Sequence, residues 1–292
     1  MCGGRVTVVP LVILPPDQQW DQALLLDTLA RCPGYTFEQC TVPIGFDGAV
    51  VVVPGRYDGA LDITQAAIEG MDWCVVMVTG DEASVYPWQD LKHERMRLWV
   101  QTPRPQLHEG AGRFFGVGYT PHTRPLLREL GPHVPRTNDW CFAGQVSHKR
   151  RKECVEVLRG MDGGVLVETP GFTQGLPHAE YARLLASTRV VACPSGPATP
   201  DTFRVWEALE AGCIPVADGM AYSYDSRPYW RFLFGEDPPF PVVLDSWQTF
   251  PGILAELLDG WDEWANAVQA WWIAKKREMA LALADDLAAV MG

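Results

Sequence analysis

Residue types suited to binding a charged ligand gather in the stretch from Val190 to Gly219. Two short apolar runs, one ending at Cys193 and one at Ala217, flank a loop and a helix that we expect to begin near Asp201 or Thr202. This order of strand, loop, helix and strand is typical of a βαβ unit, in which the helix N-terminus faces the loop. A helix N-terminus carries unpaired N–H groups and roughly half a positive charge, so the stretch predicts an anion site that suits a diphosphate.

The side chains of this unit extend the prediction. Arg204 and Glu207 share one helix face, which places a cation for phosphate beside a carboxylate for ribose hydroxyls. Glu210 repeats the spacing one turn on and is the alternative ribose ligand. The predicted donor-binding residues of the unit are Ser195, Gly196, Thr202, Arg204, Glu207 and Glu210. The competing interpretation is an ordinary βαβ unit whose helix carboxylates are solvated.

A family resemblance covers the same helix and the strand after it. The run R-V-W-E-A-L-E-A-G-C-I-P-V, from Arg204 to Val216, resembles the donor-binding segment of exostosin-like glycosyltransferases, and the loop from Cys193 to Gly196 resembles their Pro-x-Gly loop. A looser similarity extends back to Asn138. The resemblance implies an α/β, GT-B-like fold: two Rossmann-like parallel-sheet domains facing a cleft, with the C-terminal helix crossing back. It also implies a nucleotide-sugar donor, most often a UDP-sugar, held mainly by the C-terminal domain.

A second phosphate-facing corner is predicted around residues 138–152. A strand from Asn138 ends at Gly144, and a helix rich in lysine and arginine follows, in which Arg150 or Arg151 is expected to reach the diphosphate. Spacing does not separate the two arginines, and a solvated basic helix end is the alternative for either. After the next strand, the loop from Thr169 to Gly175, with Phe172 and Thr173, is expected to touch the nucleobase.

The first half of the chain also alternates strands and helices. Strands are expected at Arg5 to Leu14, Val50 to Val53 and Trp73 to Val78, and this alternation predicts a parallel sheet. Ligands of such sheets gather at the carboxyl ends of strands, so the loops there should supply the general base for an inverting transfer. Asp81 or Glu82 is our choice because both follow a central strand; Asp17, Asp58 and His108 remain open. The aromatic and basic stretch from Ser84 to Pro105 either holds an acceptor or packs on the sheet.

Proline content and periodicity predict the domain organisation. Four prolines between Thr120 and Pro135 indicate an interdomain linker. We therefore expect an acceptor-side domain over residues 1–135, a nucleotide-sugar-binding domain over 136–245, and C-terminal helices over 246–292 that pack back on the body. In those helices a stripe containing Trp261, Trp264, Val268 and Trp271 follows the helical period.

Composition excludes several classes of protein. The 292 residues are 47% hydrophobic, and no apolar run approaches the length of a membrane span. A net charge of −12 argues against broad, nonspecific binding to nucleic acid. Eight scattered cysteines without zinc spacing favour a reducing, cytoplasmic location. A P-loop, a complete dinucleotide fingerprint and a D-x-D motif are all missing from the sequence, so neither a cofactor nor a metal is implied.

These patterns support two hypotheses from different classes. The first is an enzyme that transfers a sugar from a nucleoside-diphosphate sugar to a hydroxyl of a glycan, a protein or a modified DNA base, with inversion and without a metal. The second is a non-catalytic module that binds a nucleotide sugar, since the recognisable residues all bind donor and none performs chemistry. Release of nucleotide from a donor would separate the two.

Overall fold

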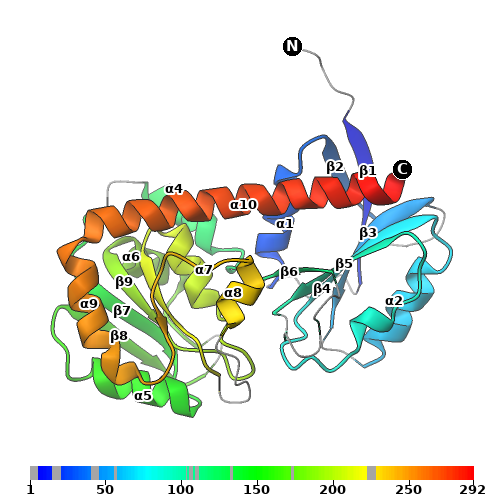
Figure 1. Cartoon of the computed structure of the whole chain (residues 1–292). Helices are drawn as coiled ribbons and strands as arrows, with labels where there is room; N and C mark the ends of the chain where they lie inside the picture. Colours follow the sequence, from blue (N-terminus) through cyan, green and yellow to red (C-terminus); the bar gives the residue numbers. More distant parts are fainter. Residues whose placement is uncertain are drawn as a thin grey trace. The chain divides into compact units, whose positions relative to one another are not determined.

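The structure is a computed structural model of the chain, and it describes residues 6–14, 21–40, 46–55, 58–102, 104, 108, 112–131, 134–171, 174–221 and 228–292 (Figure 1). The chain forms two compact units. The first comprises residues 1–117 together with 273–292, and the second comprises residues 118–272. Each unit is built on its own parallel sheet, so the predicted pair of α/β domains is confirmed.

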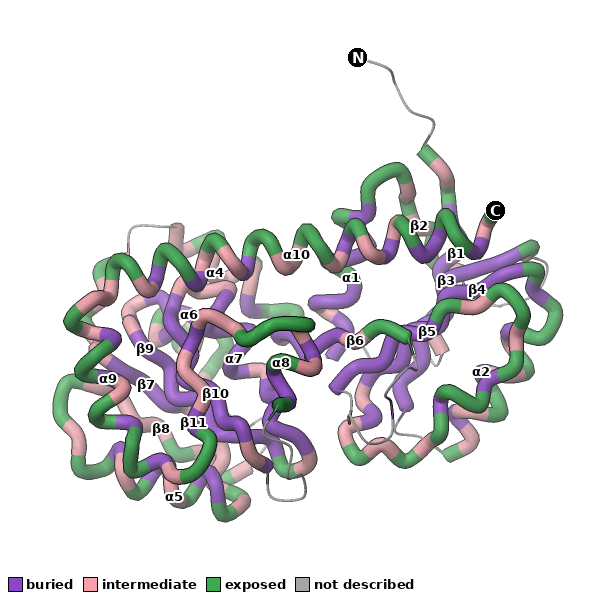
Figure 2. Tube along the Cα trace, viewed as in Figure 1, coloured by how far each residue is buried: buried purple, intermediate pink, exposed green. Residues whose placement is uncertain are grey.

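The first unit contains a six-stranded sheet in the order β2-β1-β3-β4-β5-β6. Its strands are β1 (Thr7–Ile13), β2 (Tyr35–Cys40), β3 (Gly48–Pro54), β4 (Trp73–Thr79), β5 (Met96–Gln101) and β6 (Arg113–Phe115), and its described helices before the C-terminal one are α1 (Ala23–Arg31), α2 (Ala60–Ile68) and the short η1 (Trp88–Asp90). Every residue of β3 and β4 is buried, because helices cover both faces of a parallel sheet and leave its central strands without a solvent side (Figure 2).

One strand of this unit overturns part of the acceptor interpretation. Strand β5 lies inside the stretch from Ser84 to Pro105, and it pairs in parallel with β4. Trp99 on this strand is only 2% exposed, and its indole Nε1 donates to Asp286 Oδ2 at 3.0 Å. The aromatic and basic composition of the stretch obscured this strand, in which Arg97 is exposed whereas Leu98 and Trp99 are buried. Trp99 therefore packs the core and does not line an acceptor loop.

The second unit contains a five-stranded sheet in the order β11-β10-β9-β7-β8. Its strands are β7 (Asn138–Gln145), β8 (Gly164–Thr169), β9 (Thr188–Cys193), β10 (Ile214–Asp218) and β11 (Val242–Val243). Its helices are α4 (Thr123–Leu130), α5 (Lys149–Leu158), α6 (His178–Ala186), α7 (Phe203–Glu210), α8 (Tyr229–Phe234), the short η2 (Trp247–Thr249) and α9 (Phe250–Asp259). The first strand, β7, lies inside the sheet between β8 and β9, so the chain reverses its direction of travel there.

The last helix, α10 (Trp261–Met291), contributes to both units. In the first unit Leu283, Leu287 and Val290 enter the hydrophobic core formed by alternate residues of β1, β3 and β4. In the second unit its buried residues include Val268 and Trp272, and the ring of Trp272 packs in a tilted arrangement 5.5 Å from that of Trp206 on α7. The predicted return of the C-terminal helix to the first domain is therefore confirmed, although the fully buried tryptophan is Trp272, the neighbour of the predicted Trp271.

The unit boundary differs from the predicted linker. The segment from Thr120 to Pro135 belongs to the second unit and contains α4, which packs against α6 and α7. The division lies between Val117 and Gly118 and again between Trp272 and Ile273, in place of the expected divisions after residues 135 and 245. The linker was predicted from its prolines, but a proline is compatible with the start of a helix. Pro125 occupies the first turn of α4, where a missing N–H costs no helical hydrogen bond.

Candidate functional site

The order of strands in the second unit predicts where a ligand binds. In an open parallel sheet the crevice for ligands opens at the carboxyl ends of the two strands between which the chain reverses. Those strands are β7 and β9. The candidate site is therefore formed by Gly144 to His148, at and after the end of β7, and by Pro194 to Thr202 after β9, and both segments lie within this unit.

Ser195 is the point at which these two segments meet. Its carbonyl oxygen accepts hydrogen bonds from Arg151 Nε and His148 Nε2, both at 3.0 Å. Its backbone N–H donates to Asp218 Oδ2 at 3.3 Å. The loop then turns tightly at Gly196, where a Cβ atom would lie 2.8 Å from the carbonyl oxygen of Asp201. The loop before α7 is thus held in one conformation by side chains from α5 and β10.

Arg204 extends from the first turn of α7 over the end of β7. Its Nε donates to the carbonyl oxygen of Ala143 at 3.0 Å, and its guanidinium lies 4.7 Å above the ring of Phe142. Gly144 provides the space, because a Cβ atom there would overlap Arg204 Nη2. The two predicted site residues Gly144 and Arg204 are therefore linked. Because Gly144 has no side chain, Arg204 can lie across the end of β7.

His148 is neutral near pH 7 in this position. Burial, and after it the Arg151 guanidinium, lowers the pKa of His148 to about 4, against the opposing effects of the Ser195 carbonyl and of Asp218. A carbonyl oxygen can only accept, so the imidazole proton is on Nε2, which faces Ser195 O. Nδ1 of the neutral ring therefore carries a lone pair and acts as an acceptor.

Several buried polar atoms at this strand end have no hydrogen-bond partner among the residues that the structure describes. They are Ser195 Oγ, Thr199 Oγ1, Arg204 Nη1 and His148 Nδ1. Buried polar groups are nearly always paired, so a group of unpaired ones at a ligand crevice indicates that a ligand completes them. Arginine and hydroxyl donors suit phosphate oxygens, and the neutral imidazole suits a hydroxyl or N–H of the same ligand.

The structure separates the two arginines that the sequence left equivalent. Arg150 forms a buried ion pair with Asp218, with Nη2 at 2.7 Å from Oδ1, and its Nη1 bonds to Glu153 and to the Asp245 carbonyl. Arg151 instead faces Ser195 and also donates to the carbonyl oxygen of Gln145 at 3.3 Å. Arg150 therefore stabilises the site indirectly, through Asp218, whereas Arg151 lies at the edge of the site beside Ser195.

Asp218 is a site-supporting residue that the sequence reasoning missed. It is fully buried at the end of β10, and besides Arg150 and Ser195 it accepts from Met220 N and from Trp247 Nε1, both at 3.0 Å. The available signal was an aspartate immediately after an apolar strand and before Gly219. A buried carboxylate needs several donors, and here these donors connect the β9 loop, α5 and η2.

The two glutamates of α7 lie in different surroundings. Glu207 is 5% exposed and accepts three hydrogen bonds from hydroxyls of the same unit. Glu210 lies at the other end of the helix, paired with Arg124 Nε at 3.0 Å and with Trp272 Nε1 at 2.7 Å. Thr202, predicted at the helix start, is the N-cap residue of α7 and is 8% exposed, but its side chain makes no capping hydrogen bond.

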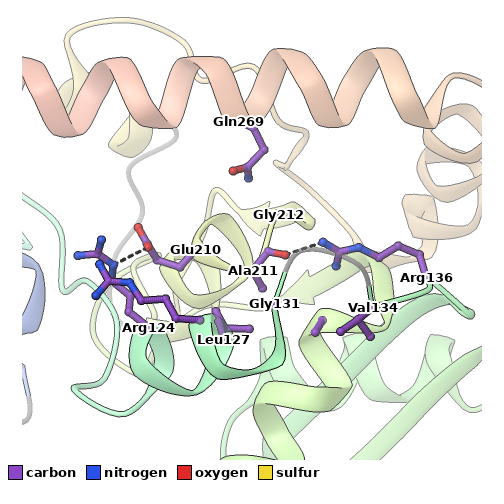
Figure 3. A pocket seen from close by; sticks show the side chains of 11 residues that line it. Arg124, Leu127, Gly131, Val134, Arg136, Glu210, Ala211, Gly212 and Gln269 are labelled. Carbon is purple, nitrogen blue, oxygen red and sulfur yellow. Dashed lines mark hydrogen bonds and ion pairs between the residues drawn. The ribbon is translucent and has the colours of Figure 1, made fainter.

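Glu210 borders a separate pocket of about 520 Å³ at the C-terminal end of α7 (Figure 3). Arg136 donates from this pocket to the carbonyl oxygen of Ala211, and Gln269 of α10 donates to that of Leu209 at 2.8 Å. Both bonds are made to carbonyl groups at the end of the helix, where the regular helical hydrogen bonds stop. Glu210 therefore lies away from the strand ends at which the strand order predicts a ligand, and of the two candidate ribose ligands Glu207 is the better placed.

The predicted catalytic residues belong to the first unit. Asp81 is 3% exposed, and its carboxylate accepts from Val85 N and Trp88 Nε1, each at 2.8 Å. His108 Nδ1 accepts from Arg104 N at 3.1 Å, and burial lowers the pKa of His108. The neutral ring thus has its proton on Nε2. Glu82 and Asp58 are more exposed, and Asp17 lies outside the described residues, as do Phe172 and Thr173 of the predicted nucleobase loop.

The fold of the chain is GT-B-like: two α/β units, each with a parallel sheet. It is similar to the structure of Anabaena Alr3699/HepE, determined in complex with UDP, with a TM-score of 0.50 and 12% sequence identity over 98% of this chain and 99% of that chain. No family model matches the sequence, and no curated protein matches it either. The similarity therefore establishes the fold, and the exostosin-like assignment stays a prediction.

Two further expectations have a partial structural counterpart. Seven described cysteines are free thiols, and six of them are buried. In the described part of the chain, no helix is long and apolar enough to cross a bilayer. The cytoplasmic location remains a prediction from the cysteine pattern.

Proposed function

We propose that the protein is a glycosyltransferase that takes a sugar from a UDP-sugar and transfers it, with inversion and without a metal, to a hydroxyl acceptor. The observation that carries this proposal is the set of unpaired buried polar atoms at the carboxyl ends of β7 and β9. Arg204 Nη1 and Ser195 Oγ supply donors to a diphosphate, and the N-terminus of α7 adds its dipole. The UDP complex of the structurally similar protein supports a nucleotide ligand.

Each group has a distinct task in the proposed reaction. When the bond between the sugar and the diphosphate breaks, negative charge accumulates on the departing diphosphate, and Arg204 with the helix N-terminus stabilises that charge. Glu207 holds the ribose. Glu82 takes the proton of the acceptor hydroxyl, because it is more exposed than Asp81, whose buried carboxylate accepts from backbone and indole donors.

Nucleotide release from donors tests the proposal. The protein is incubated with a panel of UDP-, GDP- and ADP-sugars without acceptor, and free nucleoside diphosphate is measured over hours. We expect slow release from one UDP-sugar, and a large loss of release for Arg204→Ala. The acceptor, whether a glycan, a protein or a modified DNA base, is then sought by intact mass and glycan analysis in the native host with and without the protein.

The second candidate function is a module that binds a nucleotide sugar without chemistry. One observation favours it: the two best-defined base candidates are engaged, Asp81 as a triple acceptor and His108 with its Nδ1 lone pair on a backbone N–H. Such a module would bind the UDP-sugar in calorimetry and release no UDP from it.

A further inference from the structure

Glu207 is surrounded by hydroxyl groups from two neighbouring helical segments. Its Oε1 atom accepts from Thr120 Oγ1 at 3.1 Å and from Thr123 Oγ1 at 3.0 Å. Its Oε2 atom accepts from Tyr181 OH at 3.0 Å. We call these three residues the hydroxyl cage. Thr123 begins α4 and Tyr181 lies on α6, and both helices pack in the same unit as α7, so helix packing fixes the cage around the carboxylate.

The cage donors remain protonated. Tyr181 is half-buried, and burial together with the Glu207 charge raises its pKa well above the ordinary value, against the opposing effect of Arg204. The tyrosine therefore acts only as a donor to Glu207. The two threonine hydroxyls also lie 2.9 Å from each other, and the carboxylate charge favours both protons pointing toward Oε1, since charge-assisted bonds are the stronger ones.

A count of acceptor positions gives the consequence. A carboxylate offers about four lone-pair positions, two on each oxygen. The cage occupies both positions on Oε1 and one on Oε2, which leaves a single position for a ligand. A ribose carries two neighbouring hydroxyls that could bridge the two oxygens of an open carboxylate. With Oε1 filled, Glu207 can accept only one of them.

We infer that the hydroxyl cage makes Glu207 a one-hydroxyl acceptor, so that the nucleotide site distinguishes strongly between the two ribose hydroxyls. Thr120, Thr123 and Tyr181 are thereby positioning and specificity residues. This inference rests on the proposed nucleotide-sugar site and adds how that site recognises the ribose. Arg204 lies one turn before Glu207 and influences Tyr181 electrostatically. The hydroxyl cage is therefore close to the residue that we propose binds the diphosphate.

The test compares the dissociation constants of UDP, 2′-deoxy-UDP and 3′-deoxy-UDP by calorimetry. For the wild-type protein we expect one deoxy analogue to bind at least about tenfold more weakly than UDP, and the other to bind within about threefold of it. Thr123→Val keeps the side-chain shape and opens a position on Oε1, so both analogues should then bind at least about fivefold more weakly than UDP. Tyr181→Phe opens a position on Oε2 and should have the same effect, which keeps the test valid if one variant fails to fold.

Thr188→Val is the matched control. Thr188 is also fully buried in the second unit, but its hydroxyl donates to the carbonyl oxygen of Leu184 at 2.7 Å and does not contact Glu207. This variant should keep the wild-type difference between the two analogues. Equal binding of the two analogues to the wild-type protein, whether both are weak or both are tight, would overturn the inference while leaving UDP binding intact. Absence of UDP binding would overturn the proposed UDP-sugar site itself.

Discussion

Replacing Gly144 by alanine is expected to displace Arg204 while leaving the fold in place. A Cβ atom at this position would overlap Arg204 Nη2 and lie 3.2 Å from Arg204 Cζ, and the nearest contacts are all atoms of that side chain. The end of a flexible side chain can move aside, so the backbone of β7 need not shift. The displaced guanidinium would lose its bond to the Ala143 carbonyl and its position over Phe142.

Gly144→Ala should weaken UDP binding more than it lowers the stability of the protein, and this difference is the test. The free energy of unfolding should fall by no more than about 1.5 kcal/mol, because a single hydrogen bond has a modest net effect and the freed group reaches water. A bond between arginine and phosphate is charge-assisted, so the affinity for UDP should fall by about 1.5–3 kcal/mol, which is roughly 10- to 150-fold in the dissociation constant. The affinity for uridine, which has no phosphate, should not change.

Calorimetry with UDP and uridine measures the affinities, and chemical denaturation measures stability. Gly252→Ala is the matched control, since Gly252 lies on α9 of the same unit and its added Cβ would meet nothing within 4 Å. If Gly144→Ala weakens uridine and UDP by equal factors, Arg204 does not act on the diphosphate. Unchanged UDP affinity would refute the assignment altogether.

Three other predictions concern pH, the general base and metals. Because the pKa of His148 is lowered from 6.5 to about 4 in the folded protein, the unfolded chain binds more protons between these values, so the free energy of unfolding should fall by about 1–3 kcal/mol as the pH drops through this window. Chemical denaturation of the wild type and of His148→Gln, measured above and below this pH window, checks this. If the stability of the two proteins depends on pH in the same way, the prediction is wrong. Glu82→Gln should reduce kcat at least about 100-fold with an unchanged donor dissociation constant, whereas Asp81→Asn should mainly lower stability; the reverse pattern would make Asp81 the base. Excess EDTA should leave most of the turnover intact, and activity lost on chelation but restored by manganese would assign a metal-dependent mechanism.

The sequence by itself determined the order and type of the elements around the site. The two apolar runs and the loop and helix between them predicted a strand, loop, helix and strand, and the structure contains β9, α7 and β10 there. These signals are local, because a capping position or a buried strand depends on residues close in the chain. Local signals failed where composition concealed the pattern, as at β5, and where a proline lay in the first turn of a helix, as Pro125 does in α4.

Only the tertiary structure decided which side chains face the site. Arg150 and Arg151 are adjacent on α5, and a rotation of about 100° between successive helical residues directs one to Asp218 and the other to Ser195. Their partners lie on β10 and after β9, far along the chain, so no local pattern could distinguish the two arginines. The same holds for Glu207, whose cage comes from Thr120, Thr123 and Tyr181, because contacts between residues remote in sequence exist only once the helices have packed.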